Sequence, residues 1–358
     1  MLRIYHNTRI LLPLVCLLTL YGCGTTSPSR DIATPVPHAA EQPKPVKQPA
    51  AVAVAPADEP EAVEIEAQQP AAGSVTKPST QQPGTRILLS SSAAAYREIA
   101  EQLHGSFEKP PTVHTLTGVE LNDAEVIKAI QMSPETRVVA VGLRAARAAR
   151  KLDNKRVVFC QVVNYGEHDL VSENMKGVSA LPSPHKLFAD WKTLSPQLDR
   201  VLVVSGDGFE DFMAVAREAA ARRGITLVHR VVSNDREFLY AVKRNEVPVQ
   251  GHWLLADNRV LSVKTLKEVM SYNSKEAIQT VVFQSELLDF GGLFYVMPSS
   301  LEVSDKVISR LKASHSELEI GGDDILFLDD HLMGINSQVA RQLGLEIPDH
   351  LKASVHAE

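Results

Sequence analysis

From Arg86 onward, short runs of β-branched residues alternate with longer amphipathic stretches. Short apolar runs predict buried strands, and apolar residues at every third or fourth position predict helices. Strands that are apolar throughout and separated by helices indicate parallel sheets covered on both faces. We therefore predict an α/β protein with two sheets. The expected strands are 87–89, 113–116, 138–141, 157–159, 201–204, 227–232, 253–255, 281–283 and 293–296.

Capping residues mark several of the helices expected between these strands. Asn122 with Glu125, and Asn234 with Glu237, each place a side-chain acceptor three residues before an acid, as at a helix start. Gly224 follows a basic residue and is typical of a helix end. The expected helices are 93–103, 123–130, 145–152, 185–194, 209–223, 235–244, 263–271 and 304–313.

Small polar loops follow most of these strands. Because parallel sheets bind ligands beyond the carboxyl ends of their strands, we expect a binding cleft there. Short side chains leave the first N–H groups of the next helix exposed, which suits a carboxylate, while Asp257 or Glu286 is expected to meet an ammonium group. Any one of these loops, taken alone, is explained as an ordinary helix cap. The loops are 90–92, 142–144, 161–165, 205–208, 256–258 and 284–286.

The motifs of catalysis are weak or absent. The stretch 205–208 begins like a dinucleotide fingerprint, but Asp211 stands where the third glycine is needed. Four acids within 323–330, with His331, are split by the apolar run 325–328, which indicates solvated strand ends rather than a metal site. Hydrolase, metalloprotease and phosphate-loop motifs are missing. We therefore predict no catalytic residue, no cofactor and no metal, and expect that the protein is not an enzyme.

The first residues have the pattern of an export signal. Arg3 and Arg9 precede the apolar run 10–20, which is too short to span a bilayer as a helix. The sequence Leu20-Tyr21-Gly22-Cys23 then resembles the lipobox of bacterial lipoproteins, which implies cleavage before Cys23 and diacylation of its sulfur. We expect a signal peptide over 1–22 and an exported remainder. A buried hydrophobic helix is the alternative.

The next segment, 23–85, is rich in Pro, Ala, Val, Glu and Gln and has almost no aromatic residues. It buries too little apolar surface to offset its chain entropy, so we predict a disordered tether. In a polyproline conformation, at about 3.1 Å per residue, it would reach on the order of 190 Å.

The remaining chain is long enough for one large or two medium domains. The net charge is −6 and no basic cluster is present, which disfavours nucleic acid as a partner. Of three cysteines only Cys160 lies in this part, so an intramolecular disulfide is not expected. Cys160 closes an apolar run and is expected to pack as a small hydrophobic side chain.

Four blocks carry a family resemblance. Within 157–181, the residues 174–179 read Asn-Met-Lys-Gly-Val-Ser; the block 252–258 is an apolar strand ending in Asp-Asn; 283–293 carries Glu286 and a glycine pair. The stretch 336–348 reads Asn-x-x-x-Ala-x-x-Leu-Gly-x-x-Ile-Pro. In this order, over most of 86–348, the blocks resemble a family of bacterial ABC-transporter substrate-binding proteins that includes aromatic amino acid binders.

The resemblance implies a type I periplasmic-binding fold, in which two Rossmann-like lobes with parallel sheets are joined by three crossovers and close on a small molecule. It implies a first lobe of 86–179 plus 283–313 and a second of 180–282 plus 324–351. Tyr96, Tyr165 or Trp253 is an apolar platform in this account, with core packing as the alternative. The implied ligand-binding positions are Ser91, Ser92, Leu143, Arg144, Asn164, Tyr165, Asp257, Asn258, Ser285 and Glu286.

The chain departs from this family in two loops. The first loop lacks the family's His-Pro pair, and Leu143 and Arg144 replace a Thr or Ser. Either the ligand differs, with Arg144 pairing a carboxylate, or the cleft has lost its ligand. Gly24 stands where an Asp commonly retains lipoproteins in the inner membrane, so an outer-membrane anchor is an alternative.

Two functions remain open. The first is an exported, lipid-anchored solute-binding protein of an ABC importer, which captures a small polar, amino acid-like molecule and passes it to a permease. The alternative is an outer-membrane lipoprotein that uses the same fold as an interaction module for an envelope enzyme or receptor. Both place the protein in the cell envelope, lipid-anchored and facing the periplasm.

Overall fold

The computed structural model describes residues 84–356, apart from 245–246, 314–319 and 321. These residues belong to one compact unit, Gln81–Glu358. The expected signal peptide, Cys23 and nearly all of the expected tether lie outside the described residues and stay predictions. Within the described part, no helix is both long and apolar enough to cross a membrane.

The first lobe is built on a sheet of parallel strands in the order β11-β5-β4-β3-β1-β2. Side chains pointing to opposite faces are apolar in both directions, since Val138 and Ala140 enter one core cluster and Val139 and Val141 another. Helices therefore cover both faces. The strands are β1 (Thr85–Leu89), β2 (Thr112–Thr115), β3 (Arg137–Val141), β4 (Arg156–Cys160), β5 (Met175–Val178) and β11 (Ile325–Leu326).

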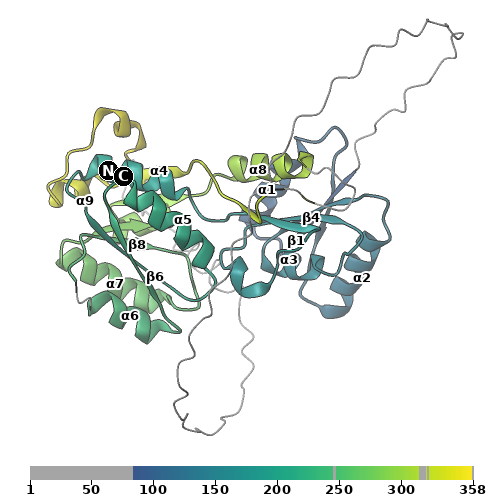
Figure 1. Cartoon of the computed structure of the whole chain (residues 1–358), viewed down its shortest axis with the longest axis horizontal. Coiled ribbons are helices and arrows are strands. Elements are labelled where there is room, and N and C mark those ends of the chain that lie inside the picture. The colour runs from purple at the N-terminus through teal and green to yellow at the C-terminus, as the bar shows by residue number, and fades with distance from the viewer. Residues whose placement is uncertain (1–83, 245–246, 314–319, 321, 357–358) are drawn as a thin grey trace, which may run out of the picture. The chain divides into compact units, whose positions relative to one another are not determined.

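Two pairs of helices cover this sheet. Apolar residues of α2 (Glu120–Gln131) and α3 (Leu143–Ala149) pack on one face, and those of α1 (Ala94–His104) and α8 (Ser300–Lys312) pack on the other. Figure 1 shows α8 beside α1, although some 200 residues separate them along the chain. A short 3₁₀ helix, η1 (Tyr165–His168), follows β4.

The second lobe repeats this plan with the strand order β12-β10-β9-β8-β6-β7, in which β12 alone among the described pairs is antiparallel to its neighbour. Its strands are β6 (Arg200–Ser205), β7 (Thr226–Val231), β8 (Gly251–Leu254), β9 (Gln279–Val282), β10 (Phe294–Met297) and β12 (Leu332–Ile335). Its helices are α4 (Pro184–Leu194), α5 (Glu210–Ala221), α6 (Asp235–Lys243), α7 (Val263–Lys275), α9 (Ser337–Gln342) and the 3₁₀ helices η2 (Ser285–Phe290) and η3 (Asp349–Ser354).

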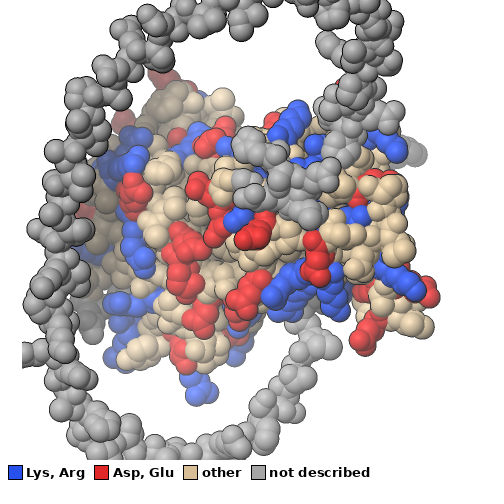
Figure 2. All heavy atoms as spheres, turned by 45° about the vertical axis from the view of Figure 1, so that its right-hand side comes forward, with Lys and Arg blue, Asp and Glu red and all other residues tan. Residues whose placement is uncertain are grey.

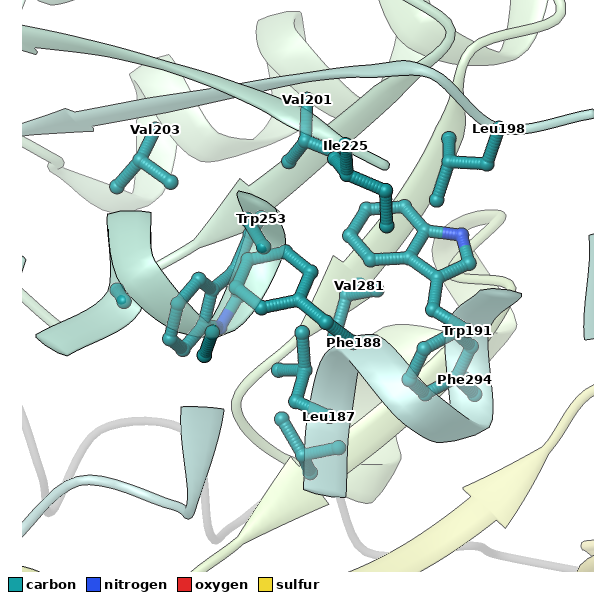
Figure 3. Packing of buried hydrophobic residues seen from close by; sticks show 14 of the residues in the cluster. Leu187, Phe188, Trp191, Leu198, Val201, Val203, Ile225, Trp253, Val281 and Phe294 are labelled. Atoms are coloured by element: carbon teal, nitrogen blue, oxygen red, sulfur yellow. The ribbon is translucent and has the colours of Figure 1, made fainter. Parts of the chain in front are cut away.

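Both tryptophans of the chain lie in the core of the second lobe (Figure 3). Trp253 is 1% exposed and meets the ring of Phe188 edge-on, with the centroids 5.8 Å apart. Trp191 meets Phe294 in the same way at 5.6 Å, and its indole Nε1 donates to Gln279. Trp253 therefore takes the core alternative and offers no exposed platform.

The α/β class and the two-lobed arrangement of parallel sheets are confirmed. Each expected strand corresponds to an observed one, and along the described residues the chain passes between the sheets three times, after β5, β10 and β11. The sequence did not indicate β5, β11, β12 or α9, which are short or carry glycine or charge.

The expected lobe boundaries at 283 and 324 are wrong. The chain does not return to the first lobe at 283, because Phe294 and Tyr295 of β10 pair with Val281 and Val282 of β9. The return comes between Met297 and Ser300, and α8 then packs its apolar face in the first lobe. The stretch 324–326 also stays in the first lobe, where β11 pairs with β5.

One of the two expected helix caps is correct. Asn234 Oδ1 accepts a hydrogen bond from Glu237 N at 3.0 Å and so caps α6. Asn122 lies inside α2, which begins two residues earlier. Asp123 is the residue that orders this entry, since its carboxylate accepts from the amides of Thr117 and Gly118.

Candidate functional site

The strand order of each sheet identifies one place where loops diverge. The chain passes from β1 to β2 in one direction across the sheet and from β3 to β4 in the other, and in the second sheet it passes from β6 to β7 and from β8 to β9 in the same opposed way. At such a switch point the loops after the two central strands separate and leave a crevice at the carboxyl edge. In this protein those loops follow β1 and β3 in the first lobe and β6 and β8 in the second.

Asp257 lies at the switch point of the second lobe and is 5% exposed. Its Oδ2 accepts from Gly206 N at 2.8 Å, which ties the loop after β8 to the loop after β6. Arg259 donates to both oxygens, from Nε to Oδ1 and from Nη2 to Oδ2, each at 2.8 Å. The carboxylate is thus engaged by donors of its own chain, and the fork holds the guanidinium in one orientation.

Arg259 is the residue on which this network converges. Its Nη2 also donates to the carbonyl oxygen of Asp207 at 2.8 Å, and its Cζ lies 5.8 Å from the ring centroid of Phe209. Burial alone would lower the pKa of Arg259, but hydrogen bonds and charge from Asp257, with Glu167 and Asp207, raise it above its ordinary value. The guanidinium therefore carries a permanent positive charge.

The remaining nitrogen of Arg259 reaches the first lobe. Nη1 donates to Oε2 of Glu167, which lies on η1 after β4. Asn164 Nδ2 donates to the same oxygen at 2.7 Å. Backbone also approaches here, since a Cβ built on Gly166 would lie 3.2 Å from the carbonyl oxygen of Gly208. The loops after β4, β6 and β8 therefore meet at one place.

The switch point of the first lobe carries a second arginine. Ser90 Oγ accepts from Ala145 N at 2.9 Å, and the exposed Arg144 donates from Nη1 to the Ser90 carbonyl oxygen at 3.3 Å. Ser91 Oγ accepts from Ala93 N, Ser92 is exposed, and Leu143 is buried as the first residue of α3. Of these positions, Arg144 presents charge to solvent and Leu143 belongs to the core.

Tyr165 has a buried hydroxyl without a hydrogen-bond partner among the described residues. The residue is 5% exposed, and its ring lies 6.4 Å from that of Phe159. Burial, with the charges of Asp211 and Glu210 on α5 of the other lobe, raises the pKa of this phenol, so it stays protonated and can donate. Gln161, at the start of the same loop, has a φ of +57°, a conformation that residues other than glycine rarely adopt.

Asn258, Ser285 and Glu286 stand apart from this network. Asn258 is exposed beside Asp257, and Ser285 Oγ donates to Glu286 Oε2 at the start of η2. Within residues 84–356 no described hydrogen bond or ion pair connects Glu286 to Asp257 or Arg259. The structure thus brings Asn164 and Asp257 together through Arg259, and it leaves the Ser285–Glu286 pair outside.

Three of the four acids within 323–330 lie beside separate lysines. Asp324 pairs with Lys176, Asp329 with Lys306, and Asp330 Oδ1 lies 3.8 Å from Lys186 Nζ. No set of three potential ligands among the described residues could hold a metal ion. Figure 2 shows acidic and basic side chains interspersed over the described surface of the face drawn.

Sequence reasoning missed Arg259 and Glu167. The available signal was position, because Arg259 directly follows the Asp-Asn pair and Glu167 stands two residues after the polar loop that follows β4. A charged residue in a loop is usually solvated, so neither residue stood out in the sequence. Only the fold brings the two together.

Comparison with known proteins supports the architecture. No protein-family model and no curated protein matches the chain. Among solved structures, a ligand-free, open substrate-binding protein with adhesive properties from Clostridium difficile is similar at a TM-score of 0.55, with 14% identity over 76% of this chain and 98% of that one. The chain has the type I periplasmic-binding fold.

A second similar structure of this fold is a complex with a ligand. It is an ABC domain in complex with L-Trp from Streptococcus pneumonia, with a TM-score of 0.52 and 17% identity, covering 76% of this chain and 98% of that one. At these identities the likeness concerns the fold, so the ligand chemistry of the present chain has to be argued from its own residues.

Proposed function

We propose that this protein is an exported, lipid-anchored solute-binding protein that captures a small polar, amino acid-like molecule between its lobes and passes it to an ABC permease. One observation carries the proposal: loops at the carboxyl ends of β4, β6 and β8 meet at a charged, partly exposed guanidinium. Switch-point loops of parallel sheets are where such folds bind ligands. The role is binding, without catalysis.

The two similar structures named above favour the same proposal. One is described as a substrate-binding protein and the other as a complex with L-Trp. A zwitterionic guest of that class would need a cation for its carboxylate and an acceptor for its ammonium. Arg259 and Arg144 are cations at the two switch points, and the buried Tyr165 hydroxyl is a free donor among the described residues.

The expected place of the ammonium group changes with the structure. Asp257 already accepts from Gly206 and twice from the Arg259 side chain, so its carboxylate has little capacity left. We propose instead that Asp257 orients Arg259. Glu286, exposed at the start of η2, remains the proposed partner of an ammonium group.

The anchor and the partner are part of the proposal. Lipid on Cys23 and the segment 24–85 would tether the binding unit to a membrane on the periplasmic side, within reach of a permease or, from the outer membrane, of other envelope proteins. Radiolabelled palmitate should label the full-length chain in cells and should not label Cys23→Ser. Labelling of both, or of neither, would remove the anchor from the account.

A thermal-shift screen of the purified full-length protein against amino acids and related metabolites tests the solute-binding role. A ligand present at a hundred times its Kd stabilises by about 2.7 kcal/mol. For a unit of this size that raises Tm by about 5 °C. If no compound of the panel moves Tm while urea unfolding shows a folded protein, solute binding is wrong.

One observation favours the second candidate, an interaction module for an envelope enzyme or receptor. Asp257, Arg259 and Glu167 satisfy one another, so the lobes have charge-paired contacts without a guest. Photo-crosslinking from Asn258, which is exposed beside this network, would separate the two functions in cells. Crosslinks to one envelope enzyme or receptor would favour the module, and crosslinks to an ABC permease would favour transport.

A further inference from the structure

We propose that Arg259 is the carboxylate-recognising residue of the cleft and that Glu167 occupies its outer nitrogen until the carboxylate of a ligand displaces it. This inference rests on the proposed solute-binding function and names the class of its substrate. The ligand is an organic molecule with a free carboxylate, and the chain carries an internal mimic of that group.

The geometry of Arg259 is that of a prepared anion site. Asp257, whose side chain is 3% exposed, holds Nε and Nη2 through two parallel hydrogen bonds. The Asp207 carbonyl oxygen fixes Nη2 further. A guanidinium held on one edge has lost most of its rotamer freedom before a ligand arrives, so binding on the other edge costs little additional ordering.

The one nitrogen not held by the second lobe, Nη1, donates to a carboxylate of the other lobe. The Glu167 side chain is 41% exposed and that of Arg259 is 30% exposed, so water and solutes reach the pair. An ion pair of this exposure contributes only weakly, because solvent screens it. A ligand carboxylate can therefore replace Glu167 at small cost, whereas it cannot replace the buried Asp257.

Tyr165, two residues before Glu167, supplies a second indication of a guest. It belongs to the same loop and 3₁₀ turn as Glu167, and its buried hydroxyl has no partner among the described residues. A buried hydroxyl without a partner costs free energy, and a polar group of a ligand would satisfy it. A molecule with a carboxylate at Arg259 and an acceptor for Tyr165 fits both observations.

The test uses the full-length protein and acetate, the smallest carboxylate probe, at concentrations up to about 0.3 M and constant ionic strength. Acetamide and chloride are the matched probes without a carboxylate. We expect acetate to raise Tm more than either does, and Glu167→Gln to increase the apparent acetate affinity about two- to fivefold, which is the range for a partly exposed ion pair. Arg259→Gln should remove the acetate-specific shift.

Two further variants keep the outcome interpretable. Arg259→Lys retains a positive charge but not the fork, so it should lose most of the acetate effect while tryptophan fluorescence reports a folded second lobe. Glu101→Gln alters an exposed carboxylate on α1, outside the network, and should leave the acetate affinity unchanged. Acetate shifts that are equal in wild type, Glu167→Gln and Arg259→Gln would overturn the assignment.

Failure of this inference and failure of the proposed function give different results. If the metabolite screen finds a ligand that binds Arg259→Gln as tightly as wild type, solute binding stands and the role of Arg259 is wrong. If acetate behaves as expected and no metabolite binds, the carboxylate site stands and the importer function falls, which leaves an acidic group of a protein partner as its occupant.

Discussion

Replacing Asp257 with alanine tests how the second lobe is held together at its switch point. The change removes the acceptor of the Gly206 amide and of two donors of Arg259. A buried amide without a partner costs about 1–3 kcal/mol. Breaking a fully buried ion pair costs about 3–5 kcal/mol, but Arg259 is 30% exposed and can turn to water, so only a small part of that cost applies. We expect a loss of about 3 kcal/mol.

Urea unfolding followed by tryptophan fluorescence is the suitable assay, because both tryptophans lie in the core of the second lobe. With an m value of about 2 kcal/mol/M, the expected loss lowers the midpoint by about 1.5 M. Asn258→Ala is the matched control, since the neighbouring side chain is exposed and should change stability by less than about 0.5 kcal/mol. A midpoint for Asp257→Ala that coincides with that of Asn258→Ala would refute the reasoning.

Three further predictions concern the cores. Burial lowers the pKa of His252 to about 4 from an ordinary 6.5, so on acidification the unfolded state binds a proton first. As the pH falls from 6.5 to 4, the free energy of unfolding should therefore decrease by about 3 kcal/mol. In urea titrations at several pH values, His252→Gln should show a smaller decrease. Gly177→Ala would place a Cβ 2.7 Å from Ile325 and should destabilise the first lobe by about 1–3 kcal/mol in thermal unfolding, whereas Gly105→Ala, with only one contact at 4.0 Å, should not. Burial raises the pKa of the Cys160 thiol to about 12, so in a chain that carries both Cys16→Ser and Cys23→Ser a thiol reagent should label the protein only in denaturant, and labelling of the native form would contradict the burial.

The central strands could be predicted from the sequence because they are buried on both faces. In β4 every residue is buried, and the run Val157, Val158 and Phe159 contains no polar residue to confuse the pattern. The strands β5 and β11 escaped prediction because their own residues give no such pattern. In β5, Lys176 and Gly177 interrupt the apolar run. The strand β11 has only two residues, so its pairing with β5 defines it and its side-chain pattern does not.

The lobe boundaries depended on information that periodicity does not contain. Both β10 and α8 have ordinary apolar patterns, and nothing in either indicates which sheet it joins. Their partners decide the matter, since Phe294 pairs with Val281 in the second lobe while Val303 and Val307 pack in the first. A glycine pair near residue 291 resembles a crossover, but Gly291 adopts a φ of +100° and ends η2 within the same lobe.

Sequence reasoning reached some residues of the candidate network and missed others. The rule that ligands lie beyond the carboxyl ends of parallel strands led to Asp257 and Asn164, and the structure connects both to one network. It could not lead to Arg259 and Glu167, because their pairing joins residues of different lobes. Whether the ten expected positions contact a ligand stays a prediction.

The most direct test of the account is small-molecule capture. Purified full-length protein is mixed with a metabolite extract, separated from free solutes and denatured, and the released compounds are identified by mass spectrometry for wild type and Arg259→Gln. We expect wild type to release one carboxylate-bearing compound, in an amount of roughly one molecule per protein molecule, and Arg259→Gln to release little of it. Recovery of no enriched compound, or of equal amounts from both proteins, would contradict the claim that this cleft holds a carboxylate ligand on Arg259.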